Sequence, residues 1–127
     1  MDRKRMTADR ILVVDDDADA REILSSRLQA CGYDVLLAES GWQALEQVRL
    51  KKPQLILLDV MMPELDGFTV CKFLKEKEET RNIPVIFLTA REQLQDVERG
   101  FTSGADDYVL KPINWERLLP KIKKYLR

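Results

Sequence analysis

The chain has 127 residues, a length that suits one domain built around a single hydrophobic core. Its formal net charge is −1 and 34% of its residues are charged, with both signs mixed, which argues against a dedicated nucleic-acid-binding or membrane-surface module. No basic run suggests direct nucleic-acid contact. No apolar run reaches the length of a signal-peptide core or a membrane span, so we expect a cytoplasmic domain with no membrane contact.

The first predicted strand is a continuous apolar run at residues 11–14, typical of a strand buried on both faces. It ends at three consecutive acids: Asp15, Asp16 and Asp17. Apolar residues at helical spacing follow between residues 20 and 31 and predict the first helix. Either Asp17 or Asp19 is expected to cap that helix.

A short strand is predicted at residues 35–38, and a helix should follow it at once. Ser40 and Gln43, three positions apart, have the spacing of a capping box, in which each side chain satisfies a backbone N–H at the start of a helix. Apolar residues continue this helix through Val48, and Pro53 closes the unit.

The organising stretch of the sequence is a third apolar run at residues 55–58, which stops at a carboxylate, Asp59. A loop punctuated by Pro63 and by the turn pair Asp66-Gly67 follows it. Asp59 could instead cap a helix, but this loop places the next helix start near residue 68. An acid at the end of a buried parallel strand lies where open α/β sheets bind their ligands.

The next strand is predicted at residues 85–88 and ends at Thr89. A helix should follow it, with its apolar face at Leu94, Val97 and Phe101.

A fifth short strand at residues 108–110 ends at Lys111-Pro112, and Asn114 is placed to cap the last helix. Pro120 lies beyond the first turn of that helix and removes a backbone donor there, which predicts a kink or a broken turn near Glu116.

The histidine and cysteine content limits the catalytic, metal-binding and redox roles that the chain can have. The chain contains no histidine, which removes histidine-based catalysis, most zinc sites and a phosphohistidine of its own. Cys31 and Cys71 lie within amphipathic helical patterns and lack CxxC spacing, so we expect them to be reduced, buried and inert.

Five strands alternating with five helices predict a doubly wound α/β fold with a five-stranded parallel sheet, in a single domain over residues 1–127 with its core in 10–126. Polar groups follow four of the strands: Asp15 and Asp16, Asp59, Thr89, and Lys111. In the flavodoxin-like strand order 2-1-3-4-5 the first and third strands are neighbours, so the acids converge. Convergent carboxylates with open water positions suit Mg²⁺.

Four motifs occur in the order and spacing of one known family: ILVVDDD, LLDVMMPELDG, PVIFLTA and DDYVLKP. The chain resembles the receiver domain of two-component response regulators, the CheY-like family, over residues 10–126. The resemblance implies that Asp59 accepts a phosphoryl group from a phosphohistidine on a separate sensor histidine kinase or histidine phosphotransfer protein.

The resemblance also implies roles for the other strand-end residues. It implies four ligands of Mg²⁺: the carboxylates of Asp15, Asp16 and Asp59 and the backbone carbonyl of Met61. Lys111 would bind a phosphoryl oxygen, and a cis peptide bond between Lys111 and Pro112 would aim the lysine at the site. Thr89 and Tyr108 would form a switch pair. This pair would change the surface of the fourth helix, fifth strand and fifth helix, to which a downstream effector or a phosphorylation-dependent second copy would bind. Met61 and Arg91 would flank the path of the water that removes the phosphoryl group.

Two other functions remain open at this stage. A pseudo-receiver would keep the fold as an interaction domain without phosphorylation, although degenerate members should lack an acid, the threonine or the lysine. An aspartyl-phosphate hydrolase of the dehalogenase type should have an Asp two residues after the nucleophile, where this chain has Met61. The sequence reaches only the last helix, so we expect no output domain within it. In the DNA-binding winged-helix branch, the dimer face usually has an acid early in that helix, where this chain has Arg117.

Overall fold

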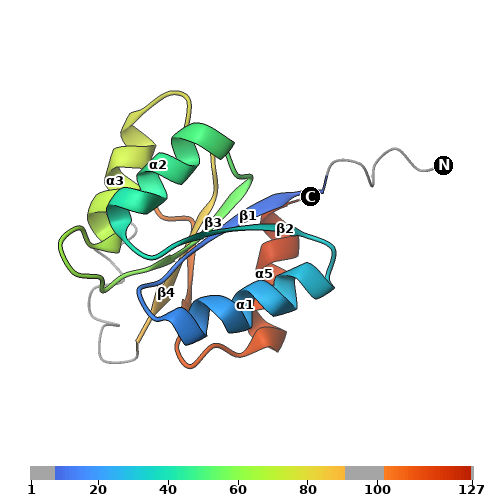
Figure 1. Ribbon diagram of the computed structural model, residues 1–127. Helices are drawn as coiled ribbons and strands as arrows, with labels where there is room; N and C mark the ends of the chain where they lie inside the picture. Colours follow the sequence, from blue (N-terminus) through green and yellow to red (C-terminus); the bar gives the residue numbers. More distant parts are fainter. Residues whose placement is uncertain (1–7, 91–101, 127) are drawn as a thin grey trace.

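The computed structural model describes residues 8–90 and 102–126, and its centre is a five-stranded sheet (Figure 1). The strands are β1 (Arg10–Val14), β2 (Asp34–Ala38), β3 (Leu55–Asp59), β4 (Val85–Thr89) and β5 (Asp107–Leu110). Their order is β2-β1-β3-β4-β5 and every neighbouring pair is parallel. The predicted doubly wound fold and its strand order are therefore confirmed.

Helices cover both faces of the sheet, with α2 and α3 on one side and α1 and α5 on the other (Figure 1). The described helices are α1 (Ala18–Ala30), α2 (Gly41–Lys51), α3 (Gly67–Glu76) and α5 (Trp115–Tyr125). The helix predicted from Leu94, Val97 and Phe101 falls outside the described residues. Among the residues that the structure describes, no helix is long and apolar enough to cross a membrane.

The apolar runs lack alternation because both faces of the central strands are buried. Leu12 and Val14 of β1 pack into the cluster under α2 and α3, whereas Ile11 and Val13 pack into the cluster under α1 and α5. All four side chains have no exposed surface. A strand that serves two cores needs an apolar residue at every position.

Helix caps fix where the chain turns away from each strand. Asp17 caps α1 by accepting from the backbone N–H of Asp19, and Ser40 caps α2 by accepting from that of Gln43. The Gln43 side chain accepts from the backbone N–H of Glu39, one residue earlier than in the usual capping box. Asn114 caps α5 as predicted.

Two predictions about local structure were wrong, and a third was wrong in part. Asp66 is not merely part of a turn, because its side chain accepts from the backbone N–H of Thr69 and caps α3. α5 continues through Pro120, so the predicted broken turn is wrong, because a proline removes only one backbone donor from a helix; the alternative, a kink near Glu116, stays a prediction. Cys31 is exposed rather than buried, because it lies at the C-terminal cap of α1, whereas Cys71 is buried as expected.

Candidate functional site

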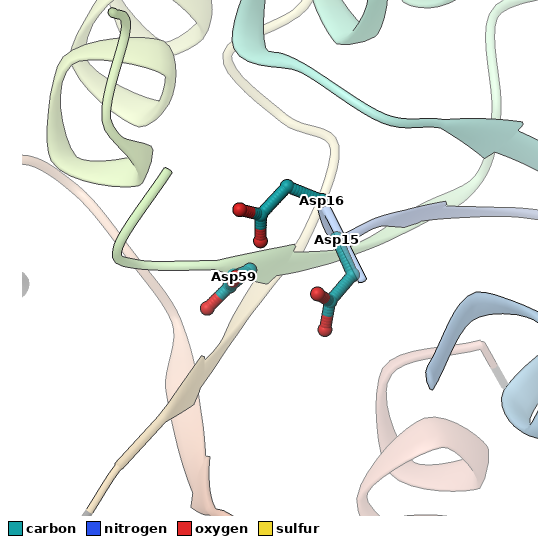
Figure 2. Close-up of side chains that lie close together, drawn as sticks. All are labelled: Asp15, Asp16 and Asp59. Atoms are coloured by element: carbon teal, nitrogen blue, oxygen red, sulfur yellow. The ribbon is translucent and has the colours of Figure 1, made fainter. Parts of the chain in front are cut away.

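The carboxyl ends of β1 and β3 bring three acids together. β1 and β3 are neighbours with Val14 opposite Leu58, so Asp15 and Asp16, just after β1, meet Asp59 at the end of β3. Oxygen atoms of these three carboxylates lie within 4.8 Å of one another. Figure 2 shows the three side chains gathered at this edge of the sheet.

Both carboxylate oxygens of Asp15 accept hydrogen bonds. The backbone N–H of Asp17 donates to its Oδ1 over 2.9 Å, and Lys111 Nζ donates to its Oδ2 over 3.0 Å. The Arg21 side chain donates to its main-chain carbonyl over 2.7 Å and lies 3.7 Å from Glu39. Sequence reasoning missed Arg21, because a helical arginine beside an acidic loop gives no motif of its own.

Lys111 links the last strand to the acids of the first and third. Its ammonium nitrogen lies 3.2 Å from Asp59 Oδ1 as well as 3.0 Å from Asp15 Oδ2. The bond between Lys111 and Pro112 is cis, which confirms that prediction, and the Lys111 backbone N–H donates to the carbonyl of Thr89 over 2.7 Å. Partial burial opposes the charge on Lys111, but the hydrogen bond to Asp15 and the charges of Asp59 and Asp15 outweigh it and raise its pKa.

Opposing influences act on the pKa of Asp59. Burial and then the neighbouring Asp15 carboxylate raise the pKa of Asp59 to about 6, with a smaller contribution from Asp16 and a partial compensation by Lys111. Asp59 therefore stays mainly ionised at pH 7 but holds a proton more readily than an ordinary aspartate. A metal ion would favour its charged form.

Thr89 and Tyr108 lie on the same face of the sheet. Thr89 follows Leu88, the register partner of Asp59, and its hydroxyl donates to the Ala90 carbonyl over 3.3 Å. It shares the face of Phe87 because side chains alternate along a strand. Tyr108 is the register partner of Phe87 and packs, partly buried, on the cluster that includes Phe87. The two residues thus share one face of neighbouring strands, with Tyr108 opposite Phe87, two residues before Thr89.

The loop after β3 returns close to the end of that strand. Met61 lies two residues beyond Asp59, and its side chain is 57% exposed. Gly67 begins α3 where an added Cβ would overlap the main-chain carbonyl oxygen of Asp59. The loop can return this close to the strand only because residue 67 has no side chain. Arg91 lies outside the described residues.

The donor set fits a hard divalent cation. Three carboxylates whose oxygen atoms lie within 4.8 Å of one another offer oxygen ligands only, and Asp16 is exposed on the solvent side, where water could complete the coordination. Mg²⁺ prefers one or a few carboxylates and retained waters to a closed protein cage. The same carboxylates repel one another in the absence of a cation, with Lys111 as a partial counter-charge.

Comparison with known proteins decides the family. The sequence pattern of the response regulator receiver domain matches residues 11–123. The chain belongs to this family.

Similar proteins agree with that assignment. The DNA-binding dual master transcriptional regulator RpaA of Synechocystis is 45% identical over 118 residues, which make up 93% of this chain and 49% of RpaA. The receiver domain thus spans about half the length of the curated relatives it matches. The signal receiver domain of a histidine kinase from Syntrophus aciditrophicus superposes with a TM-score of 0.87 at 38% identity, covering 94% of this chain and 90% of that one. The chemotaxis protein CheY4 of Vibrio cholerae gives 0.88 at 30% identity, covering 94% and 100%.

Proposed function

We propose that this receiver domain accepts one phosphoryl group on Asp59 from a phosphohistidine of a separate kinase or phosphotransfer protein, with Mg²⁺ as cofactor. The observation that supports this most is the convergence of Asp15, Asp16 and Asp59 with the ammonium of Lys111. A pseudo-receiver should lack an acid, the threonine or the lysine, whereas this chain has all of them.

The chemistry is an in-line displacement. An oxygen of the Asp59 carboxylate forms a bond to phosphorus while the bond from phosphorus to the donor imidazole nitrogen breaks, and that nitrogen keeps the electron pair. The pKa of about 6 leaves Asp59 mostly ionised at pH 7, as a nucleophile must be.

Residues around Asp59 would neutralise and position the phosphoryl group. Asp15, Asp16, Asp59 and the main-chain carbonyl of Met61 would hold Mg²⁺, which when bound neutralises phosphoryl oxygens. Lys111, already 3.2 Å from Asp59 Oδ1, would transfer its hydrogen bond to a phosphoryl oxygen. The Thr89 hydroxyl would donate to another oxygen.

The switch would act through the face that Thr89 shares with Tyr108. Movement of the Thr89 hydroxyl toward the phosphoryl group would open space for the Tyr108 ring, and the surface around β5 and α5 would change. That surface would then bind an effector, or a second copy in a phosphorylation-dependent dimer. Within one copy, Lys121 Nζ of α5 lies 2.9 Å from Asp107 Oδ1 of β5, so this ion pair already joins the two elements of that surface.

Intact-mass spectrometry tests the proposal. Incubation with Mg²⁺ and acetyl phosphate should add a single phosphoryl group to the parent and none to Asp59→Asn. Asp66→Asn is a matched control, because Asp66 caps α3 beyond the acid cluster, and it should still be phosphorylated. An adduct that persists in Asp59→Asn, or a parent that no donor phosphorylates, would contradict the proposal.

A further inference from the structure

A groove of about 750 Å³ lies between α2 and α3, on the face of the sheet opposite α1 and α5. It follows α2 from Trp42, in the first turn, to the capping residue Lys52. Its apolar lining consists of Trp42, Leu45, Val48, Phe73, Leu74 and Ile83. No member of the acid cluster lines it.

Two aromatic side chains in this lining are open to solvent. Trp42 is 58% exposed and Phe73 is 37% exposed, although both helices bury other apolar residues, such as Val48 and Leu74, against the sheet. Aromatic residues on a surface groove are typical of the centres of protein interfaces, where tryptophan contributes more than most residues. The groove therefore has the composition of a docking surface.

The two walls of the groove differ in charge. The α2 wall has two cations and one anion: Arg49, Lys52 and Glu46. The wall formed by the end of α3 and the following turn has two anions and one cation: Glu76, Glu79 and Lys77. A partner of a single sign would be attracted by one wall and repelled by the other. A partner surface with an acidic wall opposite α2 and a basic wall opposite α3 would be attracted by both walls.

We propose that a second copy of this chain docks on the groove, with α2 of each copy against α3 of the other. A two-fold axis parallel to the helices produces this arrangement, since it places each wall opposite the other wall of the second copy. Arg49 is the ninth residue of α2 and Glu76 the tenth of α3, and both helices start from the same edge of the sheet. The cations and anions therefore lie at similar depths and can pair across the axis.

This dimer is weak and depends on protein concentration, because one inter-helix groove is smaller than a standard stable interface. It is separate from the β5 and α5 surface of the proposed switch, because no residue of β5 or α5 lines the groove. The test uses unphosphorylated protein without Mg²⁺, so that failure of the dimer and failure of phosphorylation remain distinguishable.

Charge reversal of each wall gives the decisive experiment. One variant combines Arg49→Glu with Lys52→Glu, and the other combines Glu76→Lys with Glu79→Lys. Each variant alone places like charges across both contacts, so its dimer dissociation constant should rise by ~10-fold or more. In a mixed pair each acidic wall faces a basic one, so an equimolar mixture should associate as the parent does.

Sedimentation equilibrium over a concentration series measures both effects. Trp42→Glu should abolish the dimer, whereas Ile23→Glu, a control at an exposed apolar residue of α1, should leave it unchanged. Circular dichroism melts check that each variant is folded. A parent that stays monomeric at the highest attainable concentration would overturn the proposal. The same holds if the two reversed variants do not associate, or if Ile23→Glu weakens the dimer as much as Trp42→Glu.

Discussion

Lys111 Nζ lies 3.2 Å from Asp59 Oδ1, yet the pKa of Asp59 is raised to about 6. A cation at this distance would by itself lower the pKa of a carboxyl group. Burial of Asp59 and the Asp15 carboxylate outweigh it, because Lys111 is shared between both acids. The metal-free site is therefore held in an arrangement that lowers stability.

The stability of the metal-free protein should fall as pH rises from about 4 to about 6. In the folded state Asp59 binds its proton more tightly than in the unfolded chain, so folding is favoured where Asp59 is protonated and loses that advantage above its folded pKa. The shift corresponds to about 3 kcal/mol in the free energy of unfolding. Urea denaturation across this pH range should show the loss in the parent and not in Asp59→Asn. Equal pH dependence in both proteins would contradict the assignment.

Asp16→Asn should raise the melting temperature of the metal-free protein, because it removes one of three mutually repelling charges. Mg²⁺ should stabilise the parent by about 2.7 kcal/mol at a hundredfold excess over its dissociation constant, and the variant much less. Thermal melts with Mg²⁺ and with chelator measure both effects. If the variant melts lower without metal and responds to Mg²⁺ like the parent, Asp16 is a structural acid rather than a ligand.

Met61→Asn should accelerate loss of the phosphoryl group. The Met61 side chain is apolar and exposed beside the site, so it cannot orient an attacking water. An amide that makes one hydrogen bond to that water, worth about 1 kcal/mol, would speed hydrolysis about fivefold. Decay of the phosphorylated mass peak after removal of donor gives the rate. Met61→Leu is the matched apolar control, and an unchanged rate in Met61→Asn would show that this position does not limit hydrolysis.

Gly67→Ala should destabilise the fold by about 1–3 kcal/mol and slow phosphorylation, because the added Cβ overlaps the carbonyl oxygen of Asp59. Gly32→Ala is a useful comparison. Gly32 has a φ of +92° but no atom within 4 Å of an added Cβ, and it lies between α1 and β2, at the other edge of the sheet. Gly32→Ala should therefore lower the stability of the fold without changing the rate of phosphorylation. Equal phosphorylation rates in both variants would show that the loop does not position Asp59.

The central strands were predictable from sequence because their residues pack alternately into the hydrophobic clusters on the two faces of the sheet. Leu12 and Ile11 face opposite clusters, so polar residues are excluded until the strand ends at an acid. That rule also located Asp15 and Asp59. The convergence of these acids with Lys111 needed the strand order, which was taken from the flavodoxin-like fold rather than from spacing.

Side-chain contacts made across loops were not predictable in the same way. Asp66 has the local sequence of a turn residue, and only its contact with the backbone N–H of Thr69 makes it a cap. Cys31 follows an amphipathic pattern, but its place at the end of α1 exposes it. The contact of Arg21 with the Asp15 carbonyl depends on how α1 leaves the sheet. Each of these depends on three-dimensional placement that a linear pattern does not encode.

The hydrogen bond between Lys111 and Asp15 joins residues 96 positions apart, across the first and last strands in the chain. During synthesis on the ribosome, the acids of β1 and β3 emerge long before the lysine that follows β5. A nascent or truncated chain that ends before residue 111 thus has the aspartates without their shared counter-charge. If Asp59 is the phosphoryl acceptor as proposed, such incomplete chains should be poor acceptors, because Asp15 and Asp59 lack the lysine that pairs with both.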